Sequence, residues 1–244
     1  MRRWLWLVCA AVLCTLPMRA AFAVEPVVAG RTAAHGMVAQ ITLDGPIGPA
    51  AAEYFDDASK RAVADGAVAI VLRLDTPGGL ADSMRQIIAS MLACKLPVLV
   101  YVAPGGARAA SAGTYILYAG QIAAMAPATH VGAATPVRLG GATPMRDAND
   151  KPAATGSSAK DKPGDGDDAE SHKVLNDSIA YMRSLAQLRG RNGTWAEQAV
   201  RGAATLTASE AAQQHVIDFV VVDVADLLDK ADGRTVQVGD RSVT

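Results

Sequence analysis

A single hydroxyl lies among small residues in the stretch GARAASAGTYI, which runs from Gly106 to Ile116. Small side chains around Ser111 let another chain approach the backbone closely, and glycine permits turns that other residues resist. A serine hydroxyl becomes an effective nucleophile only when a base removes its proton. The stretch therefore indicates either a reactive serine or, because serine is a good N-cap, simply the start of a helix.

A second stretch, LDTPGGL, places Gly78 and Gly79 between a strand pattern and a helix pattern. Two glycines leave amide N–H groups uncovered near a helix N-terminus, where they could hold developing negative charge. Pro-Gly and Gly-Gly pairs are also common in plain turns. From spacing alone, a strand-to-helix turn without a chemical role is the simpler interpretation.

Two side chains compete for the role of the base. His130 follows Ser111 beside a predicted strand and could complete a Ser-His-Asp arrangement. Lys173 falls in the first turn of a predicted helix. The helix dipole there destabilises the charged form of the amine by roughly 0.3–1 kcal/mol. The neutral form, which a general base requires, is favoured. Asp177, four residues further on, could instead pair with Lys173 on a solvated surface. Spacing alone favours that ion pair.

The elements that must position these residues alternate along the chain. Apolar runs predict strands over 37–43, 67–74, 97–102, 121–127 and 129–134, and helical spacing predicts helices over 50–65, 80–92 and 111–120. In the second of these helices, one apolar stripe contains Leu80, Met84, Ile87 and Met91. Such alternation predicts parallel strands joined by crossover helices, an α/β layer fold.

Further elements are expected after residue 170. Helices are predicted over 171–190, 194–201, 207–215 and 224–231, with a strand over 216–223 and a polar tail from Asp232. Ser171 is a plausible N-cap and Gly190 a stop signal for the first of these helices.

The N-terminal 23 residues are expected to be a secretory signal peptide. A basic start is followed by a short apolar run and by small residues around a cleavage site at Ala23. An uncleaved anchor is the alternative, although the run is broken at Pro17 and is short for a spanning helix. We therefore expect an exported protein, periplasmic or extracytoplasmic and associated with the membrane, with a lead-in over 24–36 and one domain over 37–236.

Composition changes again between residues 136 and 170, where proline, glycine and aspartate replace large apolar residues. This pattern predicts an acidic, mobile insertion without a core of its own. Its DKPGDGDDAE sequence lacks calcium ligands, since Pro163 or Ala169 falls at a ligand position, so no metal site is expected.

Charge and cysteine content exclude several classes of function. The net charge is −1 and no basic run follows the leader, so nucleic acid is not expected as a partner. Cys94 is the one cysteine outside the leader, which excludes an internal disulfide, and its apolar neighbours indicate a small core residue. No cofactor is expected.

Four stretches in order carry a resemblance: LRLDTPGGL, GARAASAGTYI, APATHVGAATPV and IAYMRSLAQLRGRN. Together they resemble the membrane-bound Clp-class serine proteases of the NfeD family, from about Val38 to Val236. The resemblance implies a Clp protease/crotonase-like fold, with repeated β-β-α layers and a mainly parallel sheet. It also implies a Ser-Lys dyad, with Ser111 as nucleophile and Lys173 as general base.

The same resemblance assigns the oxyanion hole to Gly78 and Gly79, with the amide of Ala112 as a further donor. Where Clp protease carries its catalytic histidine, this chain has Ala134, so His130 is interpreted as structural. The chain departs from the family in its longer, more acidic insertion. Family members commonly continue into membrane helices and a small β-barrel, so the polar 237–244 tail is interpreted as a shortened link to them or as the end of a shortened relative.

The function expected from this resemblance is a serine endopeptidase that cleaves apolar segments of membrane proteins, with stomatin-like substrates. A homo-oligomer, a dimer or larger, is implied as well. The alternative is a catalytically inactive Clp-like scaffold that binds membrane-protein partners. A crotonase relative that handles acyl-CoA ranks last, because an exported protein has little access to coenzyme A.

Overall fold

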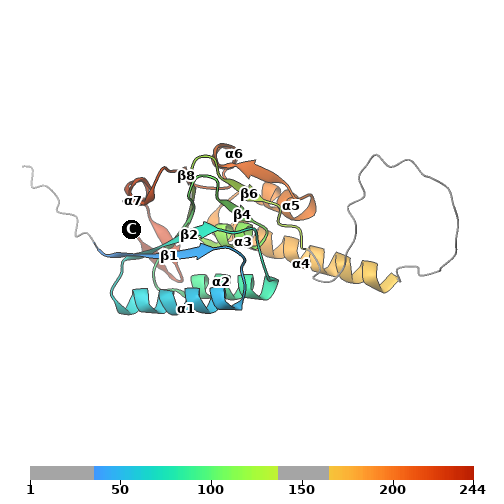
Figure 1. Cartoon of the computed structure of the whole chain (residues 1–244), viewed down its shortest axis with the longest axis horizontal. Helices are drawn as coiled ribbons and strands as arrows, with labels where there is room; N and C mark the ends of the chain where they lie inside the picture. Colours follow the sequence, from blue (N-terminus) through green and yellow to red (C-terminus); the bar gives the residue numbers. More distant parts are fainter. Residues whose placement is uncertain (1–35, 137–164) are drawn as a thin grey trace, which may run out of the picture. The chain divides into compact units, whose positions relative to one another are not determined.

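The structure is a computed structural model that describes residues 36–136 and 165–244 (Figure 1). The predicted signal peptide, nearly all of the predicted lead-in and most of the predicted acidic insertion lie outside the described residues.

A parallel sheet of five strands forms the centre of the domain, in the order β1-β2-β3-β5-β8. Strands β2 and β3 are buried almost throughout, which explains their continuous apolar runs. The predicted α/β fold with a mainly parallel sheet is confirmed. The strands are β1 (Val38–Asp44), β2 (Ala69–Asp75), β3 (Val98–Val102), β5 (Ile122–Met125) and β8 (Phe219–Val220).

Helices α1 (Pro49–Ala64), α2 (Ala81–Ala93) and α3 (Ala112–Ala119) contribute to the larger core, with α1 and α2 below the sheet in Figure 1. The predicted stripe of α2 is buried at its three later positions, whereas Leu80 is 39% exposed because it precedes the helix as its N-cap residue.

A second, small sheet has the order β4-β6-β7 and consists of Arg108–Ala110, His130–Gly132 and Thr205–Thr207. A bridge between Thr76, just after β2, and Ala109 joins it to the end of the main sheet. The sequence did not predict β4 or β7, because strands of three residues are too short to show an alternating pattern.

The C-terminal helices are α4 (Asp165–Arg189), α5 (Gly193–Arg201), α6 (Ala208–Gln213) and α7 (Val224–Ala231). Helix α4 begins at Asp165, so the predicted N-cap at Ser171 is wrong and Lys173 lies in the third helical turn. The acidic residues that suggested a loop are favourable at a helix N-terminus, where the dipole attracts negative charge.

The predicted polar tail forms an antiparallel hairpin of β9 (Val236–Val238) and β10 (Arg241–Val243). Val238 is buried, and Val236 packs against the smaller core cluster, which includes Leu227 of α7 and residues of β2, β3 and β5. Of the described helices, none is long and apolar enough to span a membrane.

Candidate active site

Ser111 occupies a sharp turn between β4 and α3, with φ +51° and ψ −114°. A residue other than glycine rarely adopts positive φ, and holding it in a sparsely populated region costs about 1–3 kcal/mol. The surrounding structure must impose this conformation. Strain of this kind concentrates at functional sites, and a strand–turn–helix geometry exposes the nucleophilic serine of α/β-hydrolases.

Backbone and threonine hydrogen bonds hold the turn. The Ser111 N–H donates to the Gly132 carbonyl oxygen at 3.0 Å, which ties the turn to β6. The buried Thr114 Oγ1 lies 2.9 Å from the carbonyl oxygens of both Ala109 and Gly132, and its single proton is shared between these two acceptors. Ser111 is the N-cap residue of α3 by position, yet its hydroxyl makes no capping hydrogen bond. Helix capping therefore does not account for this serine.

The small residues around Ser111 are explained by close approach. A Cβ on Gly113 would lie 2.6 Å from Thr76 Cγ2 and 3.4 Å from the Ala109 Cβ. A Cβ on Gly78 would lie 2.6 Å from the Ser111 Cβ and 3.1 Å from its Oγ. The glycine turn and the serine turn are therefore in direct contact, and no larger side chain fits between them.

The Gly78–Gly79 turn has different hydrogen-bonding states at its two amides. The Gly78 N–H donates to the buried Thr76 Oγ1 at 3.0 Å, and Gly78 has φ +118°. Gly79 is exposed, and a Cβ there would lie 2.0 Å from the Ile47 carbonyl oxygen. Within the described part of the chain, the N–H groups of Gly79 and Ala112 donate no hydrogen bond. Two backbone donors beside the serine turn thus have no partner among residues 36–136 and 165–244.

Lys173 is exposed on α4 and forms no ion pair with any described residue. The alternative pairing with Asp177 is not formed, because Asp177 binds Arg85 of α2. Helices α3 and α4 run in the same direction. Tyr115 stacks on Tyr181, and further along both helices Arg189 Nε donates to the Ala119 carbonyl oxygen at 2.8 Å.

Tyr115 fixes this helix pair at the end near the site. Its hydroxyl bonds to the Ser178 side chain and donates to the Ala134 carbonyl oxygen at 3.3 Å. Burial raises the pKa of Tyr115 to about 12, so the hydroxyl stays neutral and keeps its proton. Ser111 lies about one turn before Tyr115 on α3, and Lys173 lies about two turns before Tyr181 on α4.

His130 lies on β6, where its backbone is paired with Arg108 and Thr207. Its ring makes no hydrogen bond to Ser111 or to another described residue. Ala134 is buried and donates its N–H to the Ala199 carbonyl oxygen.

Thr76 and Thr114 were missed in the sequence analysis. Both are fully buried threonines that hold the backbone of a turn next to the serine. The available signal was their position, directly before the glycine turn and three residues after Ser111.

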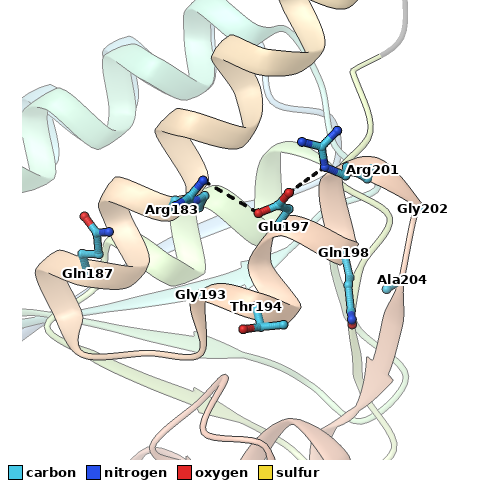
Figure 2. Close-up of a pocket in the computed structure, with 9 residues that line it drawn as sticks. All are labelled: Arg183, Gln187, Gly193, Thr194, Glu197, Gln198, Arg201, Gly202 and Ala204. Carbon is cyan, nitrogen blue, oxygen red and sulfur yellow. Dashed lines mark hydrogen bonds and ion pairs between the residues drawn. The ribbon is translucent and has the colours of Figure 1, made fainter.

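A groove of about 800 Å³ lies between α4 and α5 (Figure 2). Glu197 in its wall binds Arg201 at 2.6 Å and Arg183 at 3.9 Å. Neither Ser111, Gly78 nor Lys173 lines this groove, so it is separate from the serine turn.

The parallel sheet, the small second sheet and the strained serine beside a glycine turn define a Clp-like α/β protein. Residues 37–240 match the family model described as NfeD1b, N-terminal domain, and the chain belongs to this family. The predicted family and fold are thereby confirmed.

A relative is the membrane-bound protease PH1510 of Pyrococcus horikoshii, which is 39% identical over 186 residues. The alignment covers 76% of this chain and 37% of that protein, so the chain spans little more than a third of its relative's length.

Solved structures of similar fold include variants of the 1510-N membrane-bound stomatin-specific protease. A serine-to-alanine mutant has a TM-score of 0.70 and 37% identity, covering 86% of this chain and 92% of that chain. A lysine-to-alanine mutant in complex with a substrate peptide has a TM-score of 0.71 and 38% identity, covering 86% and 88%. The 1510-N membrane protease specific for a stomatin homolog from Pyrococcus horikoshii has a TM-score of 0.67 and 34% identity, covering 86% and 87%.

Proposed function

We propose that this chain is a serine endopeptidase with a Ser-Lys dyad, in which Ser111 is the nucleophile and Lys173 the general base. The observation that carries the proposal is the strained, uncapped Ser111 hydroxyl in contact with a glycine turn and near two free backbone N–H groups. The protease names of the relatives support the same reaction class.

The reaction follows from the roles of these groups. The neutral amine of Lys173 takes the proton from Ser111 Oγ as the oxygen attacks a peptide carbonyl. The ammonium then donates this proton to the leaving amine, which leaves an ester on Ser111. A water molecule, deprotonated by the same amine, hydrolyses the ester and restores the serine.

Backbone amides stabilise the oxyanion in this scheme. Gly79 and Ala112 are the donors that the hydrogen bonding favours, because their N–H groups have no partner among the described residues. The Gly78 amide is held by Thr76, so Gly78 joins the oxyanion hole as a donor only if Thr76 releases it. Because Gly78 has no side chain, the Ser111 side chain can lie directly against it.

The parallel packing of α3 and α4 supports Lys173 as the base. Tyr115 and Tyr181 stack with 6.0 Å between their ring centroids. Ser111 precedes Tyr115 at the N-terminal end of α3, and Lys173 precedes Tyr181 on α4, so both lie on the N-terminal side of this contact. Counted from this contact, Lys173 lies about one turn, roughly 6 Å, further toward the N-terminus than Ser111, a distance that the long and flexible lysine side chain has to span. Catalytic hydrogen bonds are often long without substrate and tighten when it binds.

The proposed substrates are apolar segments of membrane proteins, with stomatin-like proteins among them. The relatives are named for a stomatin homolog, and one was solved with a substrate peptide. Leu80 and Val174 support an apolar substrate, since each follows a proposed site residue directly and is 39% or 41% exposed. We further propose an extracytoplasmic, membrane-associated location and a homo-oligomeric assembly.

Labelling with a fluorophosphonate probe tests the proposal. Wild-type protein is expected to be labelled, Ser111→Ala not at all, and Lys173→Ala about 10²–10⁴-fold more slowly, since this is the usual contribution of a general base. Lys173→Arg should be as slow, because arginine does not release its proton. Labelling should rise toward alkaline pH.

His130→Ala is the matched control and should label at the wild-type rate. Equal labelling of wild type and Ser111→Ala, or none in either, contradicts the peptidase and leaves an inactive scaffold. Loss in His130→Ala together with retention in Lys173→Arg would assign the base to His130 instead.

A further inference from the structure

Arg85 connects the helix that follows the glycine turn to the helix that carries Lys173. Its Nη2 forms an ion pair with Asp177 Oδ2, and its guanidinium carbon lies 4.4 Å from the centre of the Tyr181 ring. Arg85 is on α2, which begins at Ala81, directly after the Gly78–Gly79 turn and Leu80. One arginine therefore binds two residues of α4 from the helix that starts at the proposed oxyanion hole.

The third helix of the site joins the same cluster. The Tyr181 ring stacks on the Tyr115 ring at an interplanar angle of 21°, and Tyr115 is buried on α3 one turn after Ser111. Arg85, Tyr115, Asp177 and Tyr181 thus form one cluster, which we call the Arg85 cluster. It joins α2, α3 and α4 one to two turns beyond the residues proposed for chemistry.

On α4, Lys173, Asp177 and Tyr181 follow one another at a spacing of four and share a face of the helix. Between residues 169 and 177, every side chain except that of Leu175 is exposed, so little buried surface holds this half of α4. The contacts of Arg85 fall on the two residues that come after Lys173 on its own face. The ion pair with Arg85 also engages the carboxylate of Asp177, which could otherwise bind Lys173.

We propose that Arg85 is a positioning residue: by binding Asp177 and Tyr181 it holds the N-terminal half of α4 so that Lys173 faces Ser111. This inference rests on the proposed function. An exposed helix end frays unless other contacts hold it. An exposed ion pair and a cation–π contact each favour the ordered state by up to about fivefold, and together they raise the fraction of molecules with an aligned amine.

The test compares Arg85→Ala with Arg183→Ala. Arg183 is also an exposed arginine, but it lies on α4 itself beyond Tyr181 and pairs with Glu197 of α5 (Figure 2). With a fluorophosphonate probe, Arg85→Ala should lower the maximal labelling rate about five- to tenfold and leave the probe's half-saturating concentration unchanged. Arg183→Ala should keep both constants, and the double variant Arg85→Asp/Asp177→Arg should regain part of the lost rate.

Hydrogen exchange gives a second readout that needs no activity. In Arg85→Ala, amides over 171–178 should exchange several-fold faster, whereas those of α5 should not change. A wild-type labelling rate in Arg85→Ala, or an equal loss in Arg183→Ala, overturns the positioning role. Failure of the proposed function is distinct, because then Ser111→Ala or Lys173→Ala labels like wild type whatever Arg85 does.

Discussion

At the scale of single residues, the site depends on glycines, because a side chain at these positions would collide with its neighbours. Gly113→Ala would place a Cβ 2.6 Å from Thr76 Cγ2 inside a fully buried contact. Because Thr76 holds the glycine turn, we expect this variant to lose about 1–3 kcal/mol of unfolding free energy and most of the probe labelling. Chemical denaturation and labelling rates measure the two effects.

Gly193→Ala is the matched control, since its new Cβ would meet nothing closer than the Ala186 Cβ at 4.0 Å. Alanine in a helix is about 0.5–1 kcal/mol better than glycine, so this variant should be as stable as wild type or more so. If Gly113→Ala were equally well tolerated, the close packing of the serine turn described above would be wrong.

Residue types predicted the serine and glycine turns because close approach requires small side chains, and this requirement is visible in the sequence around Ser111. The roles of Thr76 and Thr114 were not visible, since the hydrogen bonds of Thr114 join it to two separate segments. The prediction that Lys173 lies in the first turn of its helix was wrong. Aspartate and glycine are typical of loops, but both also occur at helix N-termini, so the start of α4 was placed too late.

At the scale of elements, two arginines bind the C-terminal end of the short helix α3: Arg189, the last residue of α4, and Arg191, just after it. Arg191 Nη1 donates to the carbonyl oxygens of Tyr118 and Gly120 at 2.8 and 2.9 Å, and its Nη2 binds Asp218 at 2.9 Å. Together with Arg189 at Ala119, they bring positive charge to the end of α3, where the dipole favours it. The RGRN stretch is therefore structural in this domain.

Arg191→Met should lower the unfolding free energy by roughly 2–4 kcal/mol, because it leaves Asp218 and two carbonyl groups without this partner. Arg201→Met is the control: it removes an exposed pair with Glu197 and should change stability by about 0.5 kcal/mol or less. Denaturant titration compares the two. Similar losses in both would mean that Arg191 does not anchor α3.

Element prediction succeeded where periodic runs are long, as in α1, α2 and β1 to β3. It missed β4, β7, β9 and β10, because each has only three residues and so shows no periodic pattern; β4 and β7 also depend on pairing with β6 from another part of the chain. The parallel packing of α3 and α4 was also not predictable, because it depends on the stacking of Tyr115 on Tyr181 across an insertion.

At the scale of the whole molecule, the described domain has two core clusters, and in the C-terminal hairpin Val236 packs against the smaller cluster while Val238 is buried. Val238→Ala should cost about 1–3 kcal/mol, because the side chain is only 3% exposed. Val222→Ala, at a side chain that is 71% exposed, should change stability by about 0.5 kcal/mol or less. Equal effects would show that the hairpin does not pack as part of the domain.

The central claim is that the amine of Lys173 serves the hydroxyl of Ser111. A crystal structure with a fluorophosphonate bound covalently to Ser111 Oγ tests it most directly. We predict Lys173 Nζ within about 2.6–3.2 Å of that oxygen, and the phosphonyl oxygen bound by the amides of Gly79 and Ala112. Lys173 in solvent, with another side chain at hydrogen-bond distance from Ser111 Oγ, would contradict the account.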